Sequence, residues 1–393
     1  MRKIAADLIL PISLKPVRKG VIIVDDDGKI LKIDDQRNYD PAELEIYKGV
    51  IVPGFVNTHC HLELSHMKGK VDTGKGLIPF ITDVVTKREA PETEIAQAIA
   101  NAEAEMIQNG IVAVGDISNV TDTFPQKAKG NLRYYTFVEF FDFLLDHTAV
   151  AEFEKFKAVF DQLELTDGSQ KSLVPHAPYS VSRRLFQLLN DANGNAPLTI
   201  SIHNQELTAE NDLFLQKSGD FIGFYNSFGI GLEAFEATGK TSIHYAIEQM
   251  NPKHKTLFVH NTKSTIADIQ AAQAWGKDNV YWVTCPNANL YIENSLPDYR
   301  YFIDTNANLT IGTDSLTSNW QLCILEEMKT IAKYQSYIPF DMMIRWATLN
   351  GAEALGFDDT LGSIEVGKKP GLNLLNLDKN LKLSANTTVT KLV

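Results

Sequence analysis

Five histidines and one aspartate stand at the downstream ends of short apolar runs that are spaced like β-strands. These residues are His59, His61, His176, His203, His260 and Asp314. Eight such runs occur between residues 51 and 314, and the four other histidines show no such placement. In a parallel (β/α)₈ barrel the carboxyl ends of all strands meet at one face, where the active site lies. The pattern therefore predicts a metal site at the mouth of such a barrel.

The two histidines nearest in sequence have the spacing of a ligand pair. His59 and His61 are two residues apart on one predicted strand, so both side chains point to the same face. Cys60 points the other way, and we expect it to be a small buried hydrophobe. With His203 and Asp314 the pair gives three imidazoles and one carboxylate, which suit zinc or a similar divalent ion, with iron left open. A closed zinc site that only stabilises the barrel is the less favoured alternative, because structural zinc prefers cysteine-rich sites.

An open site of this kind supplies a nucleophile, and nearby residues can move its protons. A divalent ion lowers the pKa of a bound water toward about 7, so hydroxide is available at neutral pH. Glu206 lies three residues after His203 and is the predicted proton shuttle between that water and a substrate nitrogen. The alternative for Glu206 is a helix-start glutamate favoured by the macrodipole. His260 is either a further ligand or a neutral imidazole that polarises the water, and Asp314 both ligates and accepts the proton of the water.

Other residues near these strand ends are candidates for holding the substrate. His176, in the segment PHAPYS with Tyr179, is expected to face the substrate; the alternative is a hydrogen-bonded loop histidine. Glu63 lies two residues beyond His61 and points the same way if the strand continues. It is a candidate for binding a ribose hydroxyl or a ring nitrogen, and an exposed loop carboxylate is an equal alternative. Glu139 and Asp116 also lie near strand ends and are weaker candidates.

Alternating strand and helix signals place these residues in one architecture. Between residues 51 and 355 they predict right-handed βαβ units and a parallel sheet. A helix is expected over residues 93–109, ended by Gly110, and another after Ser182, which can cap it. Two further helices are expected over residues 322–333 and 341–354. The aromatic segment at residues 219–229 is expected to be a packed helix or loop, with a lid as the alternative.

The two chain ends differ from this centre. Residues 1–50 hold short β-like runs at 5–10, 20–24 and 29–33, and the last residues have alternating apolar positions with glycines at turns. We therefore expect residues 1–50 and 356–393 to pair into a small composite β-sandwich. Residues 51–355 would form the metal-dependent catalytic barrel.

Composition excludes several classes of function. The chain has 393 residues and a net charge of −12, so it has no basic surface for nucleic acid or anionic membranes. The three cysteines are far apart and form no CxxC pair, which favours a reducing compartment. The N-terminal run IAADLIL is too short to span a bilayer and is not followed by a cleavage pattern. We expect a cytoplasmic protein.

These motifs resemble those of the amidohydrolase superfamily, in the order of that family and over almost the whole chain. PGFVNTHCHLELSH resembles its first-strand motif, and later segments resemble its later motifs: HAPYS, SIHNQE, VHN, CPNANLYI, GTDS and GSIEVGKKPGLNLL. The family usually shows ADLVL where Pro370–Leu374 stand, a departure that concerns packing. The combination of motifs is similar to that of the mononuclear deaminases of aminated heterocycles: HxH, HxxE, a histidine on the sixth strand and an aspartate on the eighth. HLELS with HAPYS resembles the aminofutalosine deaminase branch, although NQE is an unusual version of its motif.

The resemblance implies roles for individual residues. His59, His61, His203 and Asp314 would bind the metal, and Glu206 and His260 would handle protons. Binuclear relatives carry a carbamylated lysine at the end of the fourth strand. Here that end carries His176, and Lys171 lies at the opposite end of the strand, so we expect one catalytic metal.

The resulting prediction is hydrolytic deamination of an aminated heterocycle, most simply an adenine-containing nucleoside such as aminofutalosine. Hydroxide adds to the amino-bearing carbon, Glu206 protonates the neighbouring ring nitrogen, and ammonia leaves. The same site could serve a guanine deaminase, a triazine chlorohydrolase or an amidase, and the minor alternative is a non-catalytic scaffold. The expected partners are the small-molecule substrate and water, and a homodimer is implied by the resemblance alone.

Overall fold

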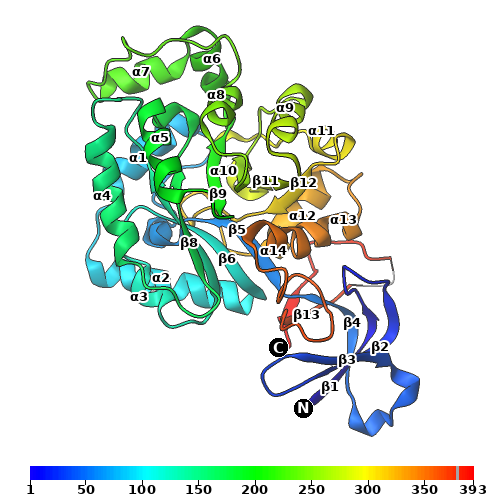
Figure 1. Ribbon diagram of the computed structural model, residues 1–393. Helices are drawn as coiled ribbons and strands as arrows, with labels where there is room; N and C mark the ends of the chain where they lie inside the picture. The colour runs from blue at the N-terminus through cyan, green and yellow to red at the C-terminus, as the bar shows by residue number, and fades with distance from the viewer. Residues whose placement is uncertain (378–379) are drawn as a thin grey trace.

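A computed structural model of the chain describes residues 1–377 and 380–393 and has eight parallel strands at its centre, surrounded by helices (Figure 1). The strands form two four-stranded sheets with the orders β5-β6-β7-β8 and β12-β11-β10-β9. All eight predicted apolar runs contribute to these strands. Their bounds are β5 (Phe55–Cys60), β6 (Ile111–Ser118), β7 (Arg133–Phe140), β8 (Gln170–Pro175), β9 (Thr199–Asn204), β10 (Lys255–His260), β11 (Val280–Thr284) and β12 (Asn308–Ile311).

The edges of the two sheets meet at both seams. Between β8 and β9, the backbone N–H of His203 donates to the carbonyl of His176 at 2.9 Å. Between β12 and β5, the hydroxyl of Thr58 donates to the carbonyl of Ile311 at 3.0 Å. The predicted α/β architecture with parallel strands is confirmed. A continuous eight-stranded ladder is not found among residues 1–377 and 380–393, because β12 is only four residues long and His176 lies just beyond β8.

The helices follow the predicted alternation. Those between the strands are α1 (Leu77–Lys87), α2 (Glu92–Gln108), α3 (Phe124–Lys127), α4 (Ala149–Gln162), α5 (Arg183–Asn193), α6 (Thr208–Gln216), α7 (Asp220–Ser227), α8 (Ser242–Gln249), α9 (Ile266–Gly276), α10 (Pro286–Glu293) and α11 (Tyr299–Asp304). Those after the last strand are α12 (Ile324–Tyr334), α13 (Phe340–Trp346) and α14 (Leu349–Leu355). Short 3₁₀ turns are η1 (Gln36–Asn38), η2 (Pro41–Glu43), η3 (Leu62–Met67), η4 (Pro178–Ser180) and η5 (Lys277–Asn279).

Local sequence signals explain where several helices begin and end. Helix α2 matches the predicted helix, and Gly110 after it has a φ of 76°. The hydroxyl of Ser182 accepts the N–H of Leu185 and caps α5 as expected. The single helix expected over 341–354 is two helices, because the backbone leaves the helical region at Thr348. No helix in the described residues has the length and hydropathy required to cross a bilayer.

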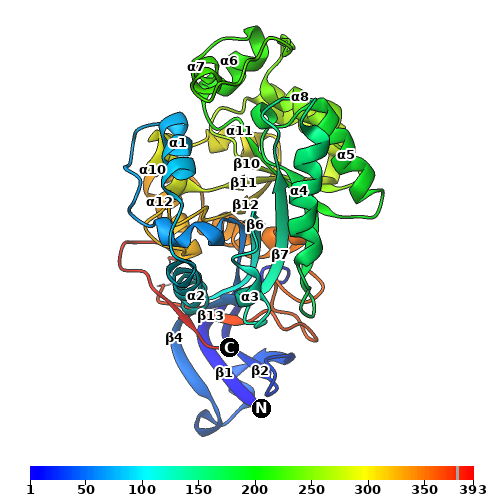
Figure 2. The ribbon, with the colours of Figure 1, turned by 90° about the vertical axis from the view of Figure 1, so that its left-hand side faces the viewer.

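Both chain ends contribute to a third sheet, of six strands, which lies below the eight parallel strands (Figure 2). Its order is β14-β13-β4-β1-β2-β3, with bounds β1 (Arg2–Ile9), β2 (Val17–Val24), β3 (Ile30–Asp35), β4 (Glu45–Pro53), β13 (Leu372–Leu375) and β14 (Val389–Lys391). The ends therefore pair, as predicted. The two-layer sandwich is not confirmed, since the described strands of the two ends form one sheet. Strand β4 runs through the expected boundary at residue 50 and continues across Gly54 into β5, the strand that carries His59.

Candidate active site

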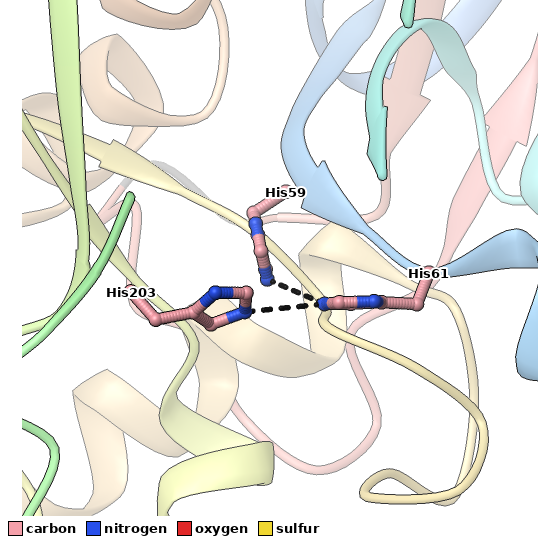
Figure 3. Close-up of side chains that lie close together, drawn as sticks. All are labelled: His59, His61 and His203. Atoms are coloured by element: carbon pink, nitrogen blue, oxygen red, sulfur yellow. Dashed lines mark hydrogen bonds between the residues drawn. The ribbon is translucent and has the colours of Figure 1, made fainter. Parts of the chain in front are cut away.

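Three imidazole nitrogens converge at the carboxyl ends of β5 and β9 (Figure 3). The Nε2 atom of His61 lies 3.2 Å from Nε2 of His59 and 3.2 Å from Nε2 of His203. Nitrogens about 2.0–2.1 Å from a tetrahedral zinc ion lie roughly 3.3 Å from one another, so these separations fit two ligand pairs of one ion. Uncharged nitrogens that face each other with lone pairs are stabilised by a cation between them. The donor set therefore fits a borderline divalent metal.

Asp314 lies beside this histidine cluster. Its Oδ1 atom is 3.5 Å from Nε2 of His61 and 3.7 Å from Nε2 of His59. Its Oδ2 atom accepts the hydroxyl of Ser318 at 2.6 Å. The Asp314 backbone has a φ of 57°, and its N–H donates to the carbonyl of His59 at 3.0 Å. A side chain at Gly312 would come within 2.8 Å of the His59 Cβ, so glycine allows this loop to approach the strand.

Hydrogen bonds behind His203 fix its orientation. Its Nδ1–H donates to the carbonyl of His176 at 3.0 Å, and Oε1 of Glu139 lies 3.2 Å from the same nitrogen. Nε2 is therefore left as the nitrogen that faces His61. Burial alone would raise the pKa of Glu139, but the charge of His176 and the hydrogen bond from His203 lower it to about 2. Burial alone would lower the pKa of His203, but the hydrogen bond and the charge of Glu139 raise it to about 9, so a metal ion must displace a proton from this ring when it binds. Carboxylates placed in this way commonly orient metal-binding histidines.

Glu139, His176 and His203 form a second group of nitrogen and oxygen atoms within 4.8 Å of one another. The first group, His59, His61 and His203, meets the same limit. His203 belongs to both groups, and its Nδ1 is engaged by the His176 carbonyl and Glu139. The first group offers three free nitrogens and a neighbouring carboxylate, so it is the better metal site.

Glu206 and His260 lie close to each other beside the histidine cluster. Oε1 of Glu206 lies 3.7 Å from Nε2 of His260. Burial raises the pKa of Glu206 to about 8 and lowers that of His260 to about 4. The Nδ1–H of His260 donates to Oδ1 of Asn289 at 2.8 Å, which leaves the Nε2 of a neutral imidazole toward Glu206. A carboxyl group that exchanges its proton near neutral pH suits a proton shuttle.

Buried Glu210 holds the turn that carries Glu206. Its carboxylate accepts the backbone N–H groups of Gln205 at 2.9 Å and of Glu206 at 3.1 Å. Gln205 has a φ of 46°, a conformation uncommon for a residue with a side chain. The hydroxyl of Thr262 donates to the carbonyl of Glu206 on the other side. Hydrogen bonds on both sides of this turn therefore fix the backbone of Glu206.

A cavity of about 1000 Å³, part of it open to solvent, brings most of the predicted site residues together. The predicted residues that line it are His61, His176, Tyr179, His203, Glu206, His260 and Asp314. His59 is fully buried beneath it. His176 makes a 2.6 Å hydrogen bond between Nδ1 and the hydroxyl of Ser180, and the Tyr179 ring packs on Phe221 with centroids 4.4 Å apart.

Glu63 does not line this cavity. It is buried, and its Oε2 accepts the backbone N–H groups of Asn119 at 2.9 Å and Val120 at 3.2 Å. Its Oε1 lies 3.4 Å from Nη2 of Arg88. Burial raises the pKa of Glu63 to about 7. Arg88 and Asn119, which the sequence did not single out, line the cavity in front of it, so a direct contact of Glu63 with substrate stays a prediction.

The two weaker candidates, Asp116 and Glu139, have different surroundings. Glu139 reaches His203, as described above. Asp116 forms a buried ion pair with Lys127 at 2.6 Å and accepts the N–H of Leu62, the residue after His61, at 2.8 Å. Sequence spacing gave no signal for Lys127. Lys171 lies near the start of β8, where its ammonium donates to carbonyls at the end of α4, far from the strand end that carries His176.

The chain belongs to the amidohydrolase family, whose family model matches residues 50–392. It is 26% identical to the adenosine deaminase of Helicobacter pylori over 90% of this chain and 86% of that protein. It is 27% identical to the aminodeoxyfutalosine deaminase of a Nitratiruptor species over 90% of this chain and 87% of that protein. The resemblance read from the sequence motifs is thus confirmed.

Solved structures show the same fold. The structure of Helicobacter pylori aminofutalosine deaminase in complex with methylthio-coformycin has a TM-score of 0.79 and 24% identity, over 97% of this chain and 93% of that chain. An adenosine deaminase from Xanthomonas campestris with bound zinc has a TM-score of 0.73 and 23% identity, over 96% of this chain and 85% of that chain.

Proposed function

We propose that the protein is a metal-dependent hydrolytic deaminase of an adenine-containing nucleoside, such as aminofutalosine or a close relative, and that it releases ammonia. The observation that carries the proposal is one cavity in which converging histidine nitrogens lie beside a carboxyl group of raised pKa. Oε1 of that group, Glu206, is 3.7 Å from Nε2 of a neutral histidine, His260. Relatives named as adenosine and aminodeoxyfutalosine deaminases support the same reaction class.

His59, His61, His203 and Asp314 would hold a single divalent ion, with zinc as the first choice and iron as the alternative. The 3.2 Å separations between histidine nitrogens support tetrahedral zinc. The zinc in the Xanthomonas campestris structure is consistent with this choice. When bound, such an ion supplies a water whose pKa falls toward about 7.

The residues around the cavity would then move protons and hold the substrate. Glu206 accepts a proton from the attacking water and delivers it to the ring nitrogen beside the amino-bearing carbon. The oxygen of the water adds to that carbon, the carbon–nitrogen bond breaks, and a second proton passes through Glu206 to the leaving amine. Neutral His260 and Asp314 accept hydrogen bonds from the water, and the burial of both side chains strengthens each interaction. The net reaction exchanges the amino group for oxygen and releases ammonia.

His176 and Tyr179 line the cavity beside these groups and would contact the heterocycle. Glu63 would act on the ribose, either directly or through Arg88. His176 is held by Ser180, and the Tyr179 ring by Phe221, so both present fixed surfaces to the substrate. Rigid contacts of this kind orient a reacting carbon at low entropic cost.

We also propose that the two sheets act as one (β/α)₈ barrel over residues 51–355, and that residues 1–50 with 356–393 form a supporting domain. The hydrogen bonds at both seams support closure. A cytoplasmic location is consistent with three cysteines that are all buried and free. A homodimer is carried over from the resemblance alone.

The test is product analysis with zinc-loaded protein. The panel contains aminofutalosine, adenosine, methylthioadenosine, S-adenosylhomocysteine, guanine, cytosine and a chlorotriazine, and both ammonia and chloride are measured. Ammonia from an adenine nucleoside supports the proposal. Ammonia from guanine alone, or chloride from the triazine, favours a different leaving group or ring. Folded protein that is insensitive to zinc and silent on the whole panel would support the non-catalytic scaffold.

A further inference from the structure

Helix α1 turns its apolar residues toward the active-site cavity. Leu77 is the only residue of this helix that is buried. Phe80, Ile81 and Val84 are half-buried, Val85 is 53% exposed, and all four line the cavity. Their spacing places them on one face of the helix. Phe80 and Ile81 also pack against the hydrophobic core, whereas Val84 and Val85 extend the apolar surface along the cavity.

Other residues that line the same cavity are also apolar. Phe141 and Phe143 follow the end of β7, and Phe224 comes from α7. Helices α1 and α7 are in contact, and both lie at the end of the molecule away from the six-stranded sheet (Figure 2). Together these residues form an apolar part of the cavity lining, called the sleeve here and defined as Phe80, Ile81, Val84, Phe141, Phe143 and Phe224. The sleeve leads to the histidine cluster, because the same cavity is lined by His61 and His203.

The charged side chain available to a group in the sleeve is positive. Among the residues that the structure describes, Arg88 is the only lysine or arginine that lines the cavity. Its carboxylate partner Glu63 lies behind the wall and already accepts two backbone N–H groups. The carboxylates that do line the cavity, Glu139, Glu206 and Asp314, are near the histidines. An ammonium group in the sleeve would therefore find no free carboxylate and would meet the charge of Arg88, at a high cost in an apolar environment.

We propose that the sleeve binds the substituent at the 5′ position of the nucleoside and selects a bulky apolar group over a hydroxyl or an ammonium-bearing tail. This inference rests on the deaminase function proposed above. When the reacting ring lies at the histidines, the ribose lies farther along the cavity. The 5′ substituent is then the part of the nucleoside that reaches the sleeve. The same cavity is lined by the histidines and by the sleeve, so one substituted nucleoside can contact both.

The test compares kcat/KM for ammonia release among nucleosides that differ only at the 5′ position. They are adenosine, 5′-methylthioadenosine, 5′-phenylthioadenosine and the two 5′-thioethers with carboxypropyl and aminopropyl tails. We expect the phenylthio compound to exceed adenosine by at least about tenfold, since one methylene in an apolar pocket already changes kcat/KM by about 10–200-fold. The aminopropyl compound should fall below the carboxypropyl compound by about tenfold or more.

A matched pair of variants locates the effect. Val84→Asp places a charge on the α1 face and should lower the phenylthio-to-adenosine ratio by about tenfold. Val150→Asp is the control, because Val150 is 52% exposed on α4 and does not line the cavity. Its ratio should match that of the wild type.

The outcomes separate the two proposals. The inference about the sleeve is overturned if kcat/KM for adenosine equals or exceeds that for the apolar thioethers, or if the aminopropyl compound is preferred to the carboxypropyl compound. Either result leaves the deaminase function standing. An unchanged ratio in Val84→Asp also overturns it. No ammonia from any of the five nucleosides contradicts the deaminase function itself, and the inference falls with it.

Discussion

The Nε2 atoms of His61 and His203 lie 3.2 Å apart although the residues are 142 positions apart in the sequence. His61 follows the last residue of β5, and His203 is on β9. The second nitrogen of His203 donates to a backbone carbonyl, which fixes the ring. Bringing two unprotonated nitrogens this close is favourable when a cation binds both, and the following predictions depend on that arrangement.

Removing one histidine of the pair should remove the metal. His61→Ala leaves His59 and His203 without the nitrogen that lies 3.2 Å from each. We expect the variant to lose zinc on dialysis while the wild type retains it, as measured by elemental analysis. His147→Ala is the control, since His147 is exposed on the loop before α4. Full zinc content in His61→Ala would contradict the assigned ligand set.

Replacing Glu206, the proposed proton shuttle, should separate metal binding from turnover. In Glu206→Gln the side chain keeps its size but cannot accept a proton. We expect unchanged zinc content and a fall in kcat of about 10²–10⁴-fold, the range for loss of general acid–base catalysis. Steady-state ammonia release and elemental analysis on the same samples give both values. Wild-type turnover in this variant would rule out the role of Glu206.

Buried Glu327 should make the protein less stable as the pH rises. It accepts two hydrogen bonds from Asn287 and one from Asn319, and burial raises its pKa from 4.5 to about 8. Between these values the folded state holds a proton that the unfolded state releases, so raising the pH favours unfolding.

The measurement for Glu327 is the free energy of unfolding in urea at several pH values. The free energy of unfolding of the wild type minus that of Glu327→Gln should decrease as the pH rises from about 5 to about 8. The same difference for Glu164→Gln, at an exposed position, should stay flat. A difference for Glu327 that rises over this range would contradict the direction of its pKa shift.

The buried ion pair beside the first strand should matter far more than a surface pair. Lys127 and Asp116 are 2.6 Å apart, and both side chains are almost fully buried. Lys127→Met leaves an unpaired buried carboxylate and should lower the free energy of unfolding by about 3–5 kcal/mol. Lys157→Ala removes the exposed pair with Asp161 and should cost about 0–1 kcal/mol. Equal losses in urea unfolding would show that burial of the Lys127 pair is not decisive.

The sequence was most informative where periodicity and strand ends coincide. Each strand of the centre is an apolar run, because strands of a covered parallel sheet are buried on both faces. Because parallel strands end at one face, the placement of His59, His61, His203 and Asp314 at the ends of these runs predicted that they lie close together. Helix caps such as Ser182 could also be predicted from the sequence.

Features that depend on contacts between distant segments could not be predicted. The pairing of β4 with β13 decides that the chain ends share one sheet, and no local pattern specifies that partner. Glu63 has the spacing of a cavity residue, but the 3₁₀ turn η3 begins at Leu62 and turns its carboxylate toward Asn119. The positions of Arg88 and Lys127 near the site become apparent only when helices α1 and α3 are packed against the parallel strands.

The most direct test of the central claim is the rate of ammonia release from adenine nucleosides by zinc-loaded protein, measured beside chelator-treated protein and the Glu206→Gln variant. The account predicts release from at least one nucleoside, loss of that release on chelation, and its recovery when zinc is restored. Release that is unaffected by chelation, or no release by fully metal-loaded protein from any adenine nucleoside, would contradict it.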